Sequence, residues 1–385
     1  MYDSPQQFLP LMPAVHMLVP YLERAASIVY RAAELSGFAH PNTRGALQDL
    51  LRSMNSYYSN GIAGQGTSPR NIDAALRQEF SDRPEIARLQ RIAVAHMDAE
   101  REVEEQAARV SPLNADFVQI AHRALYGRLE SHDRTTKDGL VVEPGTLREI
   151  DVTVGRHSPP AWQSLPQFME AFTSHYGRQW TNELRLIAIA CAHQRMAWMH
   201  PFADGNGRAT RLQTHAAMWP VTRGLWSVNR GLARGVQDYH GHLAAADAPR
   251  QDDLDGRGNL TQTGLLLWID YFLRVCEEQV DYMSRMLALN SMKEKIKASV
   301  LIETAKGRLR AEAALPIYHL FAAGPATRGE FIQMTGLGER TGRSLLAAAL
   351  RCGLVASDTS HAPVRFAIPL DSLPILLPAL YGAEE

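Results

Sequence analysis

The chain has 385 residues, with 40 Lys and Arg against 41 Asp and Glu and a net charge of −1. This near neutrality excludes a global basic field that would recruit nucleic acid or anionic lipid. The length is sufficient for two or three domains, each with its own hydrophobic core.

The cysteines and the apolar segments indicate the cellular compartment of the protein. Cys191, Cys276 and Cys352 stand singly and far apart in apolar helical contexts, which is typical of reduced thiols rather than of disulfides or a zinc site. The N-terminus has no basic segment leading into an apolar core, and no apolar run approaches the roughly 20 residues that span a bilayer. We therefore predict a soluble cytoplasmic protein with no membrane association.

Helical periodicity dominates the first part of the chain. The pattern predicts helices over 19–34, 43–58, 69–80, 85–110 and 116–129. Ser68 can cap the third of these, with Pro69 at its first position. The sequence thus predicts a mainly α-helical body.

One stretch departs from the helical pattern. Residues 139–154 alternate β-branched residues with turn residues, which predicts a short β-hairpin. The tract 154–162 follows and leads through Pro159 and Pro160 into the next helix. Taken by itself, this pattern favours an ordinary surface hairpin.

The stretch richest in chemistry runs from His200 to Arg211 and reads His-Pro-Phe-Ala-Asp-Gly-Asn-Gly-Arg-Ala-Thr-Arg. Gly205 and Gly207 allow the backbone to bend sharply, so that its N–H groups converge. A predicted helix over 208–218 follows. The turn therefore presents a helix N-terminus, where unpaired N–H groups and the helix dipole attract an anion.

The charged residues of this stretch favour a phosphate site. Arg208 and Arg211 share one face of the first helical turn, where the dipole disfavours cations unless an anion is bound. Asp204 is a hard oxygen ligand suited to Mg²⁺. His200 ends an apolar helix over 184–199, and we expect it to be a base of near-neutral pKa. Each residue alone could be a surface charge or a structural histidine; together they indicate phosphate chemistry.

The run from His200 to Arg211 resembles the Fic motif, HxFx(D/E)GNGRxxR, at every defined position. Most studied Fic proteins are protein adenylyltransferases. The resemblance therefore implies transfer of AMP from ATP to a Tyr, Ser or Thr hydroxyl of a protein target, the chain itself included, with release of pyrophosphate. It also implies Mg²⁺ as cofactor and ATP as co-substrate.

The resemblance assigns a role to each motif residue. It implies that His200 is the general base and that Asp204 binds magnesium. The turn of Gly205, Asn206 and Gly207 would cradle the phosphates, and Arg208 and Arg211 would contact them. Arg211 would also stabilise the charge that develops during catalysis, and Phe202 would anchor the loop in the core. The hairpin over 139–154 resembles the Fic flap, which aligns a target segment by strand addition.

After the motif, the segment 225–243 leads to a helix that bears Tyr239. Fic proteins place an aromatic residue near the adenine at this point, so the resemblance implies nucleotide contact by stacking. Packing on the helix face is the alternative. The aromatic stripe of Trp268, Tyr271 and Phe272 on the following helix is interpreted as core.

A regulatory segment is degenerate in this chain. Fic proteins with an inhibitory helix carry (S/T)xxxE(G/N), whose glutamate pairs with the second motif arginine. Residues 59–64 keep Ser59 and Gly64, but Ala63 replaces the glutamate. A methyl group cannot pair with Arg211, so the resemblance implies a chain without this inhibition and argues against AMP removal.

The C-terminal pattern changes from about residue 293. Short helices are predicted over 315–322, 327–334 and 339–352, with extended segments over 353–357 and 364–368. This is the outline of a winged helix-turn-helix, and it resembles the tail of many bacterial Fic proteins. Few basic residues are available, so DNA binding is only weakly supported; Arg340, Arg343 and Arg351 could equally serve helix solvation or protein docking.

The predicted architecture is thus a Fic-type helical bundle with a hairpin flap and a winged helix-turn-helix domain. We assign 1–110 to an N-terminal helical region, 111–290 to the catalytic domain and 291–385 to the winged helix. Two other functions stay open: a DNA-binding regulator whose Fic body senses nucleotide, and a Fic transferase with another donor, such as UTP or a phosphocholine nucleotide. The sequence leaves open whether the chain forms a homodimer.

Overall fold

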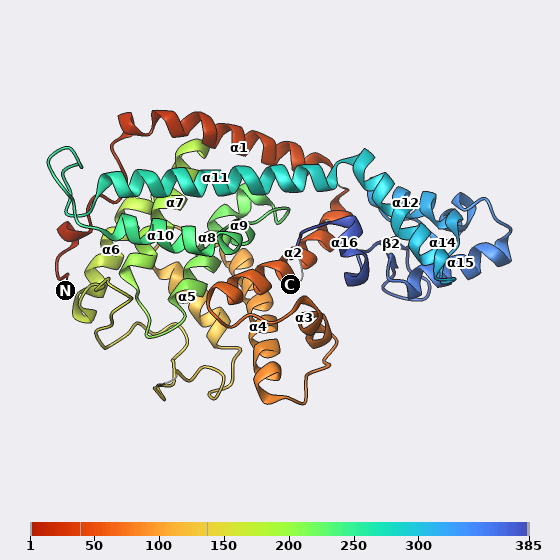
Figure 1. Cartoon of the computed structure of the whole chain (residues 1–385), viewed down its shortest axis with the longest axis horizontal. Helices are drawn as coiled ribbons and strands as arrows, with labels where there is room; N and C mark the ends of the chain where they lie inside the picture. The colour runs from red at the N-terminus through yellow and green to blue at the C-terminus, as the bar shows by residue number, and fades with distance from the viewer. Residues whose placement is uncertain (1, 39, 137, 383–385) are drawn as a thin grey trace. The chain divides into compact units, whose positions relative to one another are not determined.

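The computed structural model describes residues 2–38, 40–136 and 138–382 of the chain. Helices make up most of these residues, as predicted, and strands are few and short (Figure 1). The chain divides into two compact units made of separate segments. The first unit comprises Met1–Tyr30, Asn55–Thr222 and Ser227–Gln279, and the second comprises Arg31–Met54, Arg223–Trp226 and Val280–Glu385. The contiguous boundaries predicted above stay a prediction.

The first unit holds the motif and most of the helices that surround it. Its helices are α3 (Pro69–Leu76), α4 (Pro84–Gln106), α5 (Asp116–Tyr126), α6 (Leu165–Tyr176), α7 (Asn182–Met199), α8 (Asn206–Thr222), α9 (Val228–Arg234) and α10 (Val236–Asp247), with the 3₁₀ turns η1 (Pro5–Phe8), η2 (Val15–Met17) and η3 (Trp162–Ser164). Three longer helices, α1 (Val19–Phe38), α2 (Pro41–Ile62) and α11 (Gln262–Leu287), have residues in both units.

Several helices begin where their sequence supplies a cap. The Ser68 side chain accepts a hydrogen bond from the Asn71 N–H and Pro69 follows it, which confirms the predicted start of α3. Thr181 caps α7 through the Leu184 N–H. These caps satisfy N–H groups that have no partner inside their own helix.

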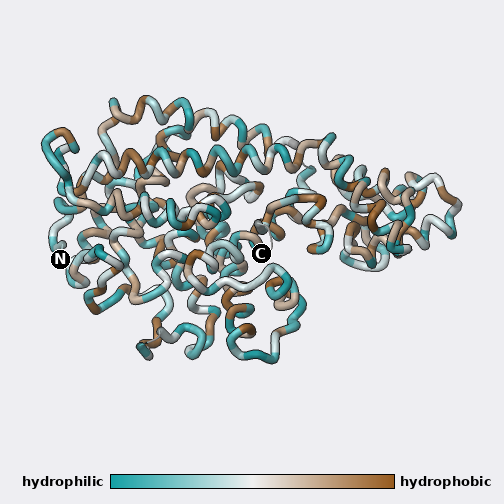
Figure 2. The backbone as a smooth tube through the Cα atoms, in the orientation of Figure 1, coloured by the Kyte–Doolittle hydropathy of each residue, from teal (hydrophilic) through white to brown (hydrophobic). Residues whose placement is uncertain are grey.

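The core of the first unit around the motif is formed by α4, α5 and α8, which pack on one another. Its buried side chains include Phe117, Leu125 and Leu212. Figure 2 shows hydrophobic and hydrophilic residues alternating along the helices, as expected for helices that bury one face. This packing fixes α8, whose first turn carries the motif arginines, against a rigid support.

The second unit ends in the elements that the sequence predicts. It contains α12 (Leu289–Ala305), α13 (Ala314–Ala323), α14 (Arg328–Met334), α15 (Glu339–Arg351), α16 (Leu373–Leu376), the turns η4 (Ala311–Ala313) and η5 (Leu370–Ser372), and the strands β1 (Val355–Ala356) and β2 (Arg365–Phe366). The strands pair antiparallel, with Val355 opposite Phe366. Thr327 and Glu330 form a capping box at the start of α14.

The predicted hairpin over 139–154 is less regular than expected. In the described residues of this region, strand pairing is limited to single bridges, between Thr135 and Val141 and between Val154 and His157. The second bridge closes a tight turn in which the Val154 and His157 N–H groups each donate to the other's carbonyl at 2.9 Å. Gly155 makes this turn possible with a φ of 59°.

Among the helices of the described residues, none combines the length and apolar character needed to cross a membrane. The cysteines are free thiols: Cys191 and Cys276 are buried and Cys352 is partly buried.

Candidate active site

The motif loop begins where α7 stops. His200 caps α7 in the left-handed conformation, with φ 49° and ψ 61°, and its N–H donates to the Met196 carbonyl at 3.2 Å. A non-glycine residue with positive φ is uncommon and is found at functional sites more often than elsewhere. Pro201 then prevents the helix from continuing, as the sequence predicts.

The loop is closed by its own residues. The Phe202 N–H donates to the Asn206 side-chain oxygen at 2.8 Å, and the Asn206 amide donates back to the Phe202 carbonyl at 2.8 Å. The Phe202 ring is fully buried, consistent with a core anchor. The Asn206 side chain therefore holds the loop, so a contact with phosphate at this residue falls to its backbone N–H.

Gly205 lets the loop pass close to α5. Its φ is 81°, and a Cβ at this position would lie 2.4 Å from a ring carbon of Tyr126. The space around Gly207 is less restricted. A Cβ there would lie 3.0 Å from the end of the flexible Arg211 side chain. The first N–H groups of α8 follow directly and have no partner inside the helix.

Two residues of α5 support the loop, and the sequence reading missed both. The ring of His122 stacks between Phe202, at 3.9 Å between centroids, and Tyr126, at 4.3 Å. Its Nδ1 accepts from the Gly145 N–H at 2.9 Å, which leaves Nε2 to donate to the Asp204 carbonyl at 3.1 Å. The signal was a His and a Tyr four residues apart on one helix face.

Arg148 is the third support that the sequence reading missed. Its buried guanidinium donates to three carbonyls, those of His200 at 2.9 Å, Ile150 at 2.8 Å and Pro160 at 2.5 Å. Its own N–H donates to the Pro201 carbonyl at 2.9 Å. One side chain thus ties the motif loop to the segment before α6. An arginine in an irregular stretch gives no pattern by which this role could be predicted.

The first motif arginine lies in a polar group with Asp204. The Tyr126 hydroxyl donates to Asp204 Oδ2 at 2.6 Å and accepts from Arg208 Nη2 at 2.6 Å, while Arg208 Nη2 lies 3.5 Å from Asp204 Oδ2. Arg208 Nη1 donates to the Gln65 side chain, just beyond α2. The Asp204 side chain is 48 % exposed, so a cation can reach its carboxylate.

The second motif arginine is buried and is held by α2. Arg211 Nε donates to Ser59 Oγ at 3.0 Å, and Arg211 Nη2 donates to the Ser59 carbonyl at 2.8 Å. Ala63 is exposed and lies beyond the end of α2, and Gly64 follows with a φ of 69°. The segment 59–65 thus reaches both motif arginines through neutral oxygens, those of Ser59 and Gln65.

His200 differs from the near-neutral base that the sequence predicts. Burial, followed by the charges of Arg148 and His157, lowers the pKa of its imidazole to about 4. The ring is therefore uncharged at neutral pH. A hydrogen bond to the backbone of Ala197 occupies one ring nitrogen, which leaves the other to accept a proton.

Tyr239 is buried in α10 and its hydroxyl joins a chain of hydrogen bonds. The hydroxyl lies 2.9 Å from His193 Nε2, and His193 Nδ1 lies 2.7 Å from the Thr214 hydroxyl, which donates to the Thr210 carbonyl. The hydroxyl also interacts with Arg211. Tyr239 is therefore linked to the motif by its hydroxyl, and its ring packs against His193 and Trp268.

A cavity of about 1030 Å³ brings these groups together. Residues of α7, α8, α10 and the tight turn line it, among them His200, Asn206, Gly207, Arg211, Tyr239 and His157. Asp247 also lines it, and burial raises the pKa of that carboxyl to about 7. The cavity thus combines an uncharged base, a guanidinium and a helix N-terminus, an arrangement suited to a polyphosphate and an attacking hydroxyl.

Comparison with known proteins identifies the central part of the chain. Residues 112–218 match the Fic/DOC family. The chain contains a Fic domain. The domain includes α5 and the whole motif loop, whereas Ser59, Ala63, Gly64 and Tyr239 lie outside the match.

This chain is similar to curated relatives over a limited stretch of its length. The chain is 36 % identical over 101 residues to the protein adenylyltransferase Fic of Drosophila grimshawi, which is 26 % of this chain and 21 % of that protein. The protein of the same name from Drosophila mojavensis is also 36 % identical over 101 residues, 20 % of its length. The matched stretch thus spans about a fifth of these relatives.

A solved structure resembles the fold over more of the chain. The crystal structure of a Fic domain containing signaling protein from Bacteroides thetaiotaomicron superimposes with a TM-score of 0.51 at 15 % identity. The match covers 68 % of this chain and 96 % of that one. At this identity the likeness concerns the fold alone.

Proposed function

We propose that this protein is a Fic-type adenylyltransferase that moves AMP from ATP to a hydroxyl of a protein. The observation that carries the proposal is the shared cavity, in which uncharged His200 faces the same space as Arg211 and the start of α8. The curated relatives named protein adenylyltransferase support it through the matched Fic domain.

In the proposed reaction the acceptor oxygen attacks the α-phosphorus of ATP. A bond forms between that oxygen and phosphorus, the bond to the bridging oxygen breaks, and pyrophosphate leaves with the electron pair. His200 takes the proton of the hydroxyl at its second ring nitrogen. Arg211 and the first N–H groups of α8 offset the negative charge that develops on the phosphates.

The residues present fit a magnesium ion. Mg²⁺ is usually held by one or two carboxylates together with substrate phosphates, and Asp204 supplies one accessible carboxylate beside the start of α8. Tyr126 orients that carboxylate through its hydroxyl. When bound, the ion would neutralise phosphate charge. Asp204 and Arg208 would then position the phosphates.

We also propose a cytoplasmic location and a C-terminal winged helix. Free cysteines agree with a reducing compartment. The helices α13 to α15 and the β1–β2 pair have the order of a winged helix-turn-helix. On α15, exposed Arg343 pairs with Glu339. This pairing favours a solvated helix over a DNA contact.

The experiment follows label from each α-labelled nucleoside triphosphate into protein in the presence of Mg²⁺. We expect labelling from ATP, and we expect His200→Ala to lower it by about 10² to 10⁴ while ATP affinity stays nearly unchanged, because a general base makes little ground-state contact. Exposed His361→Ala is the control.

Three results would count against the proposal. Labelling from another nucleotide alone would change the donor, and the absence of labelling from any nucleotide would favour the DNA-binding regulator. Near wild-type labelling by His200→Ala would assign His200 a structural role.

A further inference from the structure

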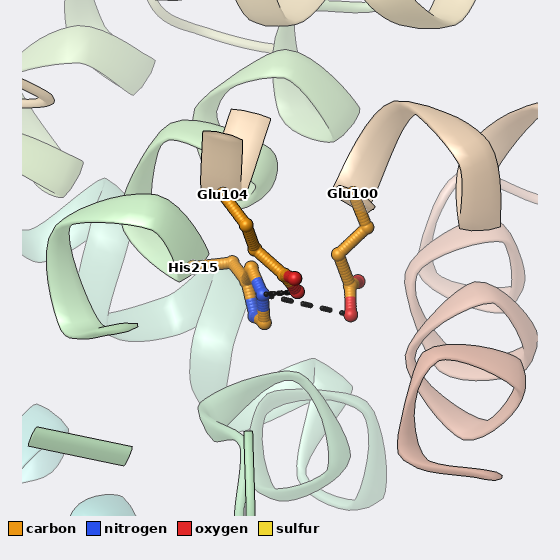
Figure 3. A group of neighbouring side chains, drawn as sticks. All are labelled: Glu100, Glu104 and His215. Carbon is orange, nitrogen blue, oxygen red and sulfur yellow. Dashed lines mark hydrogen bonds and ion pairs between the residues drawn. The ribbon is translucent and has the colours of Figure 1, made fainter. Parts of the chain in front are cut away.

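A second cluster of ligand-type side chains lies on α4 and α8, apart from the motif carboxylate. Glu100 and Glu104 are on successive turns of α4, and both point toward the imidazole of His215 on α8 (Figure 3). His215 Nε2 lies 2.9 Å from Glu104 Oε1 and 3.6 Å from Glu100 Oε1. All three residues belong to the first compact unit.

Burial distinguishes this cluster from acidic groups at a surface. The side chains of Glu100, Glu104 and His215 are 1 %, 7 % and 6 % exposed. Charged side chains are almost never this buried unless they are paired or bind a metal. The set offers one nitrogen and two carboxylates, whose two negative charges match a divalent cation.

The spacing of the ligand atoms is that of a small metal site. One ligand atom from each residue lies within 4.8 Å of the other two. Nitrogen and oxygen ligands about 2.0–2.2 Å from a zinc ion lie about 3.3–3.6 Å apart at the tetrahedral angle. Of the two imidazole-to-carboxylate distances, 3.6 Å lies at the upper end of that range and 2.9 Å is shorter than it.

A neighbouring histidine adds an independent observation. His96 precedes Glu100 by one turn, so the spacing of His96, Glu100 and Glu104 places them on one face of α4. His96 is fully buried, and neither of its ring nitrogens has a hydrogen-bond partner among the described residues. Buried polar groups are normally satisfied, so this face presents a further nitrogen donor next to the cluster.

We propose that Glu100, Glu104 and His215 form a binding site for a divalent transition-metal ion such as Zn²⁺. Imidazole favours transition metals over Mg²⁺ and Ca²⁺, which prefer oxygen ligands alone. The site is distinct from the magnesium site at Asp204 and does not depend on the proposed function. It joins α4 to α8 one turn beyond Arg211, and Asn55 of α2 donates to Glu100 Oε1 at 2.8 Å.

The test uses the full-length protein, stripped with a chelator and dialysed. Elemental analysis after incubation with Zn²⁺ should give one bound equivalent, and titration with Co²⁺ should give a visible absorption band from a nitrogen and oxygen site. Thermal melting should shift upward with Zn²⁺ and return on addition of chelator, because a ligand that binds only the folded state stabilises it.

Matched variants locate the ion. Glu104→Gln and His215→Gln should each weaken Co²⁺ binding by about tenfold or more. Glu105→Gln makes the same change on the exposed face of α4 and should leave binding unchanged. Asp204→Asn should also leave it unchanged, which separates the site from the motif.

The wild-type measurements need no variant, so they decide the matter even if a substitution prevents folding. Failure of the wild-type protein to retain Zn²⁺ or Co²⁺ would overturn the proposal. So would equal binding by Glu104→Gln and Glu105→Gln, or loss of the Co²⁺ signal in Asp204→Asn. In each case the cluster would be a buried ion-pair network.

Discussion

Gly205 is the residue on which the motif loop turns toward α5. We expect Gly205→Ala to destabilise the loop and to weaken ATP binding at least about tenfold, because it forces a positive φ on alanine and drives its Cβ to 2.4 Å from the Tyr126 ring. Calorimetry with Mg²⁺-ATP and a urea melt would measure both effects.

The control is Gly241→Ala, which makes the same change within α10, where a Cβ would meet nothing within 4 Å. That variant should gain about 0.5–1 kcal/mol of stability, because alanine is the better helix former. If the two variants behaved alike, the close approach of Gly205 to Tyr126 would not constrain the loop.

At the level of residues, the sequence identified the groups that face the cavity and missed those that hold them. His200 and Arg211 belong to a local motif with fixed spacing, so one pattern reveals them. His122 and Arg148 act through contacts with residues far along the chain, which no local pattern encodes. The pKa of His200 was also mispredicted, because burial is a tertiary property.

Arg148 ties the segment before α6 to the motif loop. Arg148→Ala should leave the carbonyls of His200, Ile150 and Pro160 without this donor, and of the three hydrogen bonds only the one to Pro160 is fully buried. At about 1–3 kcal/mol for a buried group left unsatisfied, we expect a loss of about 1–3 kcal/mol in the free energy of unfolding. Urea denaturation of this variant beside exposed Arg109→Ala would measure it; equal midpoints would show that the tie contributes little.

The end of α2 offers a second test at the scale of an element. Ser59 and Gln65, on either side of Ala63, already contact Arg211 and Arg208. Ala63→Glu would bring a carboxylate to this segment, and charge-assisted hydrogen bonds are about twice as strong as neutral ones. We therefore expect AMP transfer and ATP affinity to fall at least about tenfold.

Ala63→Gln is the matched control, because it adds the same size without the charge. The measurement is ATP-dependent labelling of both variants, with thermal melting as the test of folding. A well-folded Ala63→Glu protein with undiminished labelling would show that residue 63 does not face the motif arginines.

The helices were predicted more accurately than the extended segments. Helical periodicity and caps are local, so α1 to α5 appear where expected, with ends shifted by a few residues. The segment 225–243 leads to a helix that bears Tyr239, as predicted: α9 ends before Gly235 and α10, which carries Tyr239, follows it. The hairpin over 139–154 reduces to isolated bridges. Within it, the Ile150 carbonyl accepts from the Arg148 guanidinium and not from a strand partner.

For the whole molecule, buried histidines set the response to acid. Burial lowers the pKa of His96 and His193 to about 3 and that of His122 and His200 to about 4. These values lie below the roughly 6.5 of an unfolded chain, so the unfolded state takes up protons first. The stability that these histidines contribute should be complete above about pH 6.5 and should fall as the pH drops toward 4. Asp247, whose pKa is raised by burial to about 7, makes a smaller contribution of the opposite sign.

Each such histidine can add up to about 1.4 kcal/mol per pH unit to the slope of unfolding free energy against pH. Urea melts between pH 7 and pH 4 would measure that slope. His193→Gln should reduce it, whereas the exposed His361→Gln should not. A flat profile over this range would contradict the burial of the four imidazoles as neutral rings.

In the proposed function, the segment 59–65 would compete with nucleotide phosphates for the N–H groups of Arg208 and Arg211. Only molecules in which these guanidinium groups are released can bind phosphates fully, so the observed dissociation constant equals the intrinsic one divided by the released fraction. The linkage is reciprocal: whatever draws Ser59 and Gln65 away raises nucleotide affinity, and bound nucleotide in turn loosens the end of α2. Amide hydrogen exchange at the end of α2 should therefore speed up when ATP is added.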